Sequence, residues 1–193
     1  MEIDIEENKK CILNLLHSVD RKGIDNLIQW LCNETDFFNA PCSTKYHLSC
    51  PGGLSKHSLN VYDYFLLECK YHNDAFDYES RIICSLLHDI CKVNTYVEKE
   101  KWRKDKNNKW ESYPGYEVED KFPVGHAEKS IILIRKFIEL TDKEILAIRW
   151  HMGAFNLNQM ELYGLHDALK VDPEILLLHI ADWKSSVFLE NDV

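Results

Sequence analysis

Apolar residues recur at intervals of three and four along almost the whole chain, which is the spacing of one face of an α-helix. The pattern predicts helices around residues 12–19 and 24–31, from about 54 to 71, and from about 78 to 92. Two later helices have clear start signals, because Thr141-Asp-Lys-Glu144 is a capping box and Asp172-Pro173 places Pro directly after an N-cap. Helices with such apolar stripes bury them against one another, so we expect an all-α bundle.

The helical spacing is interrupted once, between Val93 and Val124. Segments 95–97 and 110–113 flank the polar turn 105–108, as in a β-hairpin. We therefore expect a hairpin at about 95–116, within an insertion spanning about 94–124, and a single domain over residues 1–193. The hairpin carries several basic residues near Trp102 and Trp110, which fit either a solvent-exposed ribbon or a flap that contacts substrate. These residues are Lys99, Lys101, Arg103, Lys104, Lys106 and Lys109.

Length, charge and cysteine usage narrow the classes of function. The chain has 193 residues, of which 45% are apolar, and this is enough for one sizeable core. Its 23 Lys and Arg against 32 Asp and Glu give a net charge of −9, which disfavours binding of a long nucleic acid or an anionic membrane. Seven cysteines without a CxxC pair indicate a reducing compartment. The acidic N-terminus and the lack of a long apolar run lead us to expect a cytoplasmic protein.

Nine histidines accompany these carboxylates, and neutral imidazole and carboxylate oxygen are both ligands for divalent metals. Six His and Asp residues stand in or beside apolar helical stretches, where an unpaired polar group would be costly. Convergence on metal would satisfy all of them, and six ligands suit two adjacent ions bridged by a carboxylate. They are His57 after Gly52-Gly53, the pair His88-Asp89, His126 after Gly125, His151 and Asp182.

The order of these residues, a His, then His-Asp, then a distant Asp, resembles that of the HD-domain metal-dependent phosphohydrolases. His126 and His151 resemble the two additional histidines of the dinuclear, five-histidine-like subset. The segments Gly52–His57 and Leu87–Lys92 are similar to the HD domain of certain bacterial 3′–5′ exoribonucleases, and the whole resemblance covers roughly residues 47–190. It implies an HD-domain helical bundle with the hairpin inserted. It also implies hydrolysis of a phosphomonoester or phosphodiester, in a nucleotide or small nucleotide-like substrate, by a metal-activated water.

The resemblance also implies a role for each residue. His57, His88, Asp89 and Asp182 would hold a first ion, and Asp89, His126 and His151 a second. Mixed His and carboxylate ligation favours Mn, Fe, Co, Ni or Zn over Mg or Ca. Lys92 would join Asp89 in catalysis by neutralising phosphate charge or assisting the leaving group. Weaker candidates are His47, Lys129 and Arg149 for substrate contacts, and His179, one helical turn before Asp182, as a support for that ligand.

Two other functions stay open from the sequence alone. A non-catalytic HD module could hold metal and nucleotide as a sensor. The basic hairpin could instead serve exonuclease-like activity on nucleic acid ends, although the net charge makes a long nucleic acid an unfavourable partner. The sequence is also compatible with a homodimer.

Overall fold

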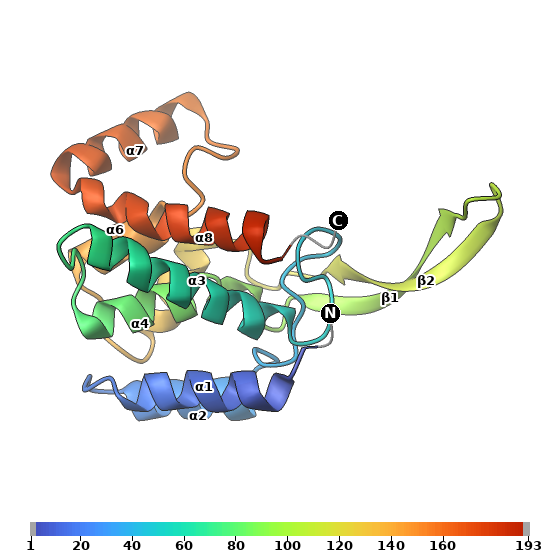
Figure 1. The fold of residues 1–193 in the computed structure, drawn as a ribbon, viewed down its shortest axis with the longest axis horizontal. Helices are drawn as coiled ribbons and strands as arrows, with labels where there is room; N and C mark the ends of the chain where they lie inside the picture. Colours follow the sequence, from blue (N-terminus) through green and yellow to red (C-terminus); the bar gives the residue numbers. More distant parts are fainter. Residues whose placement is uncertain (1–2, 191–193) are drawn as a thin grey trace.

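The computed structural model describes residues 3–190 and is mostly helical, with one antiparallel hairpin inserted between two of the helices (Figure 1). Two short 3₁₀ turns cover Ile90–Lys92 and Pro173–Ile175. Over the range described, no helix is both long enough and apolar enough to cross a membrane. The helices are α1 (Ile5–His17), α2 (Ile24–Asn33), α3 (Gly53–Tyr71), α4 (Tyr78–Leu87), α5 (His126–Arg135), α6 (Asp142–Arg149), α7 (Gln159–Val171) and α8 (Leu176–Phe188).

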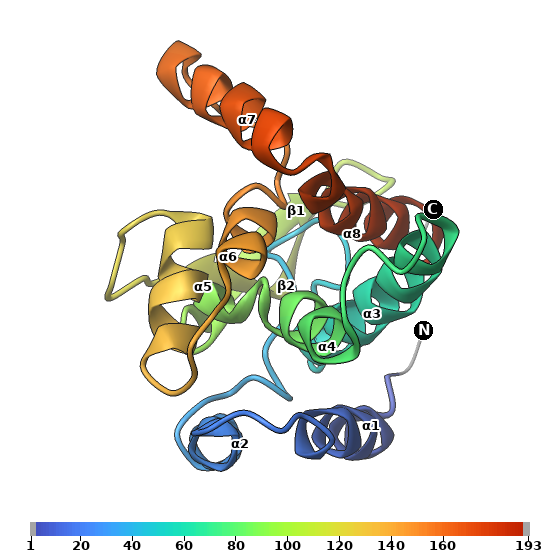
Figure 2. The same ribbon diagram turned by 90° about the vertical axis from the view of Figure 1, so that its left-hand side faces the viewer.

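The helices pack in layers around α3. This longest helix lies between α8 and α4, while α1 and α2 form a separate layer beneath them (Figures 1 and 2). The core contains fully buried Phe37 and Phe65 together with the apolar stripes of α1, α2 and α4. Burial of such side chains contributes about 1.5–3 kcal/mol each, so this helix-to-helix packing is the main source of stability.

The helix ends follow local sequence signals, with two differences from the prediction. Thr141 accepts from the Glu144 amide and Glu144 reaches back, so the predicted capping box of α6 is confirmed. The helix predicted to continue to residue 92 ends at Leu87, and a 3₁₀ turn follows. The helix α7 was not predicted, because only Ala168 of its residues is buried and it projects from the body (Figure 2).

Strands β1 (Tyr96–Lys104) and β2 (Trp110–Val118) form a two-stranded ribbon, here called the arm, that extends away from the helices (Figure 1). Its register pairs Tyr96 with Val118 at the base and Lys104 with Trp110 at the far end. The turn forms because Asp105 accepts from the backbone amides of residues 107 and 109. The predicted hairpin is thereby confirmed.

A buried ion pair fastens the α1–α2 layer to the rest. The Arg21 guanidinium donates to both carboxylate oxygens of Glu144, at 2.8 and 2.7 Å, and to Glu79 at 3.1 Å. Glu144 has no exposed surface and also accepts from the Ser80 hydroxyl at 2.8 Å. One carboxylate of α6 therefore joins the α1–α2 loop to α4.

Candidate metal centre

The Asp89 carboxylate lies at the centre of a cluster of histidines. Its Oδ2 is 3.7 Å from His57 Nε2 and 3.6 Å from His88 Nε2. Its Oδ1 is 2.8 Å from His126 Nε2 and 3.5 Å from His151 Nε2. Each carboxylate oxygen therefore faces two imidazole nitrogens.

Asp182 completes one side of the cluster. Its Oδ1 is 3.2 Å from His57 Nε2. Ligand atoms of His57, His88 and Asp182 lie within 4.8 Å of one another, as do those of His88, Asp89 and His151. The structure therefore brings together all six residues that the sequence singled out as metal ligands.

Five separate parts of the chain supply these side chains, four of them at or near a helix end. His126 is the first residue of α5, His151 follows α6, and Asp182 lies within α8. The early end of α4 places His88 at its C-cap and lets Asp89 leave the helical path, with φ −104° and ψ 15°. His57 lies in the second turn of α3, close to the loop that precedes it.

Glycine is required at the start of α3. A Cβ on Gly53 would overlap the backbone carbonyl oxygen of Leu48, and Gly52 has a left-handed φ of 78°. The Leu48 carbonyl accepts from the Cys42 amide at 3.0 Å, which holds the 42–48 loop folded against α3. The Gly-Gly pair therefore allows this loop to approach the helix that carries His57.

Three buried rings are oriented in the same way. Nδ1 of His88 lies 2.9 Å from the Ser85 carbonyl oxygen, and Nδ1 of His151 lies 2.7 Å from that of Ile148. Nδ1 of His57 lies 3.0 Å from both carboxylate oxygens of Glu190. Outer acceptors of this kind fix the tautomer of metal-binding histidines and leave Nε2 for the metal.

Four inward atoms are buried and make no hydrogen bond of good geometry within residues 3–190. They are Nε2 of His57, His88 and His151 and Oδ1 of Asp89, although this oxygen lies only 2.8 Å from His126 Nε2. Leaving several such groups unsatisfied would cost about 1–3 kcal/mol each. Divalent cations bound among these atoms would satisfy all four, so the donor set fits a metal centre.

The rings differ in protonation because their surroundings differ. Burial opposes protonation of His57, but the Glu190 and Asp182 carboxylates outweigh it, so the pKa of His57 lies well above its usual range. Burial also opposes charge on His126, yet the Asp89 carboxylate raises the pKa of His126 to about 10. Burial dominates at His88 and lowers its pKa to about 4. Without metal, protons therefore occupy two of the rings.

Lys92 lies against the central carboxylate. Its Nζ is 2.6 Å from Asp89 Oδ2 and 3.5 Å from Cys42 Sγ. Burial disfavours both charges, but each charge stabilises the other, so the pKa of Asp89 lies well below its usual range and that of Lys92 well above. The 3₁₀ turn makes this contact, since it places Lys92 three residues after Asp89.

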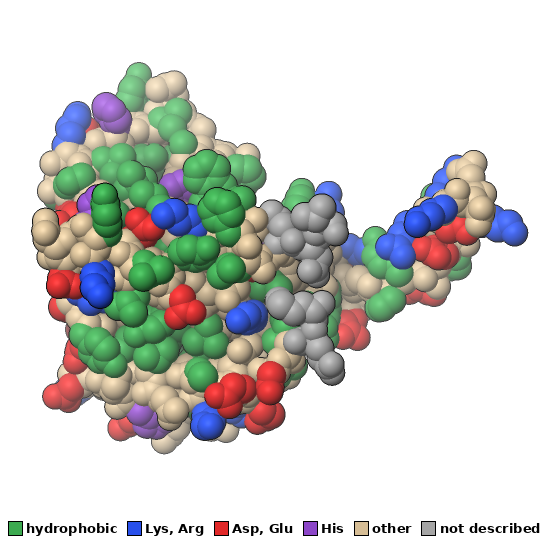
Figure 3. All heavy atoms as spheres, viewed as in Figure 1, with side chains coloured by type: hydrophobic (Ala, Val, Ile, Leu, Met, Phe, Trp, Pro, Cys, Tyr) green, Lys and Arg blue, Asp and Glu red, His purple; other side chains and the backbone are tan. Residues whose placement is uncertain are grey.

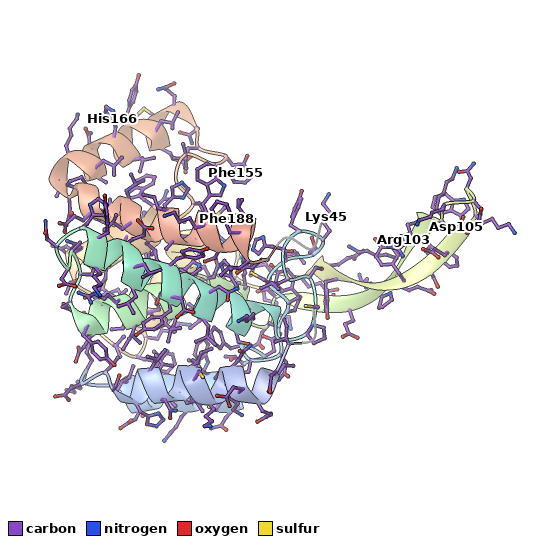
Figure 4. The ribbon with its side chains drawn as sticks, in the orientation of Figure 1. Lys45, Arg103, Asp105, Phe155, His166 and Phe188 are labelled. Atoms are coloured by element: carbon purple, nitrogen blue, oxygen red, sulfur yellow. The ribbon has the colours of Figure 1, made fainter. Side chains whose placement is uncertain are left out.

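A pocket of about 690 Å³ opens over the cluster. Asp89, Lys92 and Asp182 contribute charged groups to its lining. Phe155 and Trp183 contribute aromatic rings, and each leaves 65% of its surface exposed. Figure 4 shows Phe155 on the loop that passes above α8. The pocket therefore combines a charged region with an apolar wall.

Two of the weaker candidates line this pocket. His47 lies with its Nε2 3.3 Å from Cys42 Sγ. His179 stacks on Trp183, and its Nδ1 lies 2.7 Å from the His151 backbone carbonyl oxygen. His179 therefore contacts the chain at His151 and lies beside the pocket, whereas the sequence had suggested support for Asp182.

The other two candidates have carboxylate partners outside the pocket lining. Lys129 is buried and its Nζ lies 2.6 Å from Asp120. The Arg149 guanidinium lies 3.0 Å from Glu128 and over the Trp150 ring. Among the described residues, neither Lys129 nor Arg149 belongs to the pocket lining or to a group of potential ligand atoms.

Sequence reasoning missed Glu190 and Cys91. Glu190 is buried, accepts from the Asn60 amide at 2.9 Å, and contacts His57 across 133 residues of sequence. Cys91 Sγ is 3.3 Å from His126 Nδ1 and belongs to a group of potential ligand atoms with Asp89. Cys91 was within reach of sequence reasoning, because it is two residues from Asp89. Glu190 carried no such signal.

No protein-family model, curated protein or solved structure matches this chain. The interpretation of the site therefore rests on its own geometry.

Proposed function

We propose that this protein is a metal-dependent phosphohydrolase of the HD-domain type that acts on a small phosphoester. One observation carries the proposal: both oxygens of the buried Asp89 carboxylate face pairs of histidine nitrogens, three of which have no hydrogen-bond partner among residues 3–190. A carboxylate in that position suits two adjacent cations. Two bound divalent ions would supply an activated water and charge stabilisation at phosphorus.

The chain's own residues have distinct tasks in this proposal. His57, His88 and Asp182 would hold one ion, His126 and His151 the other, and Asp89 both. The mixed nitrogen and oxygen donors favour Mn, Fe, Co, Ni or Zn over Mg or Ca.

Lys92 is the second catalytic residue of the proposal. It keeps its proton, because its pKa lies well above the usual range. Its ammonium group lines the pocket beside Asp89, where it can pair with a phosphate oxygen of the substrate. Lys92 would therefore bind the phosphate as a fixed positive charge, and other groups would transfer protons.

The pocket supports a small, partly apolar substrate. A volume of about 690 Å³ falls in the range of small-molecule sites, which is about 300–1,000 Å³. The Phe155 and Trp183 rings offer flat apolar surfaces to the non-phosphate part of such a molecule. A nucleotide or a nucleotide-like molecule has both parts.

Metal analysis combined with a substrate screen tests the proposal. Purified protein is analysed for bound metals and then assayed for phosphate release from nucleotides, cyclic dinucleotides and short oligonucleotides with added Mn²⁺, Co²⁺ or Ni²⁺. We expect activity that His88→Ala and Asp89→Ala each abolish. His166→Ala is the matched control, since His166 is exposed on α7, a helix that carries none of the six residues (Figure 4).

Three results would contradict the proposal. Activity that survives in both variants would show that hydrolysis does not need Asp89 and His88. Purified protein that binds no divalent metal would show that the cluster is not a metal centre. Tight metal and nucleotide binding without turnover would instead favour the non-catalytic sensor.

A further inference from the structure

The outer part of the arm has a charge opposite to that of the body. Residues 101–110, here called the arm tip, contain five Lys and Arg residues and one Asp, a net charge of +4 in a chain whose total is −9. The remaining residues therefore carry −13. Figure 3 shows Lys and Arg side chains gathered at the far end of the arm, and Figure 4 locates Arg103 and Asp105 there.

The cations of the arm tip are largely available to a partner. The single carboxylate, Asp105, is engaged by two backbone amides of its own turn. Arg103 pairs with Glu111 at 2.6 Å. Within the part of the chain that the structure describes, the other cations of the tip have no ion pair: they are Lys101, Lys104, Lys106 and Lys109.

Two indole rings share one face of the arm tip. Trp102 pairs with Ser112 and Lys104 with Trp110, so the two Trp residues are diagonal neighbours on the same side of the ribbon. They expose 59% and 65% of their surfaces. The Lys104 ammonium lies 5.6 Å from the Trp110 ring centroid, which places a cation beside one of the two flat surfaces.

Distance separates the arm tip from the acidic body. Trp102 is six residues beyond Tyr96, which is about 20 Å of extended strand. The Debye length at physiological ionic strength is about 8 Å, so the negative field of the body is largely screened at the tip. The net charge of the chain therefore does not exclude a polyanion there.

We propose that the arm tip binds single-stranded nucleic acid. Unpaired bases would stack on Trp102 and Trp110 while the nearby lysines pair with phosphates, the combination by which single strands are bound without sequence preference. Glu98 and Glu100 lie on the same face between the tip and the base, so they confine the strand to the outer ten residues. An acidic polypeptide would satisfy the charges but would leave both indoles without flat partners.

Fluorescence anisotropy of a labelled single-stranded oligonucleotide of about ten residues tests this binding. The assay contains EDTA, so that it does not depend on hydrolysis and its failure is separate from failure of the proposed phosphohydrolase activity. We expect a Kd of about 1–100 µM. Replacing both Trp102 and Trp110 by Ala should weaken binding by about tenfold per ring, whereas Phe at both positions should retain most of the affinity.

The salt dependence provides a second measurement. Lys106→Gln with Lys109→Gln should lower the slope of log K against log salt by about 1.4, the value for two lost phosphate contacts to a single strand. Lys10→Gln with Lys170→Gln removes the same charge from exposed positions of the body and should leave the slope unchanged.

Three outcomes would overturn the proposal. Binding that the body variant weakens as much as the tip variant would place the strand elsewhere. Duplex DNA that binds as tightly as the single strand would exclude base stacking. Displacement by polyglutamate as efficient as by oligonucleotide would identify an acidic polypeptide as the better partner.

Discussion

Glu190 gives the sharpest test of the proposed metal centre, because it touches His57 from outside the cluster. Both of its oxygens lie 3.0 Å from Nδ1, and the residue is only 4% exposed. Glu190→Gln keeps one acceptor for the ring but removes the negative charge. Glu190→Ala removes the acceptor, so Nδ1 and the Asn60 amide both lose their partner.

The expected loss of metal affinity follows from those lost interactions. Loss of an outer hydrogen-bond partner of a ligating histidine typically lowers metal affinity 10- to 100-fold. We expect Glu190→Gln to weaken affinity by about tenfold and Glu190→Ala by nearer a hundredfold, because the alanine also leaves two buried donors unsatisfied. Part of the alanine effect will appear as a lower free energy of unfolding.

Competition with a fluorescent chelator measures Mn²⁺ or Co²⁺ affinity directly, and the visible spectrum of bound Co²⁺ reports the ligand geometry. Glu139→Gln is the matched control, since it removes the same charge from a side chain that is 87% exposed. If both Glu190 variants stay folded and bind metal within twofold of the wild type, the reasoning is refuted.

Three further predictions concern protons, the buried ion pair and the glycine turn. Because His126 must lose a proton to bind metal and its pKa is about 10, metal binding near pH 7 should release at least one proton, and affinity should rise with pH. Calorimetry in buffers of different ionisation enthalpy measures this, and no proton release would contradict it. Without metal, the raised pKa of His126 stabilises the fold fully below pH 6.5, and this contribution is lost as the pH rises through about 10. Arg21→Ala leaves the Glu144 carboxylate buried and unpaired, so urea unfolding should show a loss of about 3–5 kcal/mol. Gly53→Ala forces a steric overlap and should cost about 1–3 kcal/mol with weaker metal binding, whereas Gly164→Ala, where a Cβ fits at 3.4 Å, should be neutral or stabilising.

Helical periodicity predicted most of the fold because most helices bury one continuous stripe. The exception is informative: α7 buries only Ala168, so its residues carry no clear period. The end of α4 was also missed, since an apolar run through Ile90 continues the pattern even though the backbone turns at Asp89. That turn depends on tertiary contacts that periodicity does not report.

The positions of the candidate ligands were predictable for a different reason. A His or Asp in an apolar helix is a local anomaly that demands a partner, and six such anomalies indicated one centre. Lys129 and Glu190 show what a single sequence does not predict. In the sequence, Lys129 is a candidate for phosphate binding, but in the fold it has Asp120 as its partner. Glu190 has the sequence surroundings of an ordinary surface carboxylate, yet it is buried against His57. Partners across a fold are set by its packing, which a single sequence does not display.

Because five chain segments contribute to the cluster, metal binding there would depend on the packing of all the helices that carry it. His57 and Glu190 meet across 133 residues, so fraying of the C-terminal helix would release an outer partner of a ligand on α3. By mass action, a metal present at a thousand times its Kd would add about 4 kcal/mol to the free energy of unfolding. Hydrogen exchange in α3, α5 and α8 should then slow together on metal binding, as in a single cooperative unit.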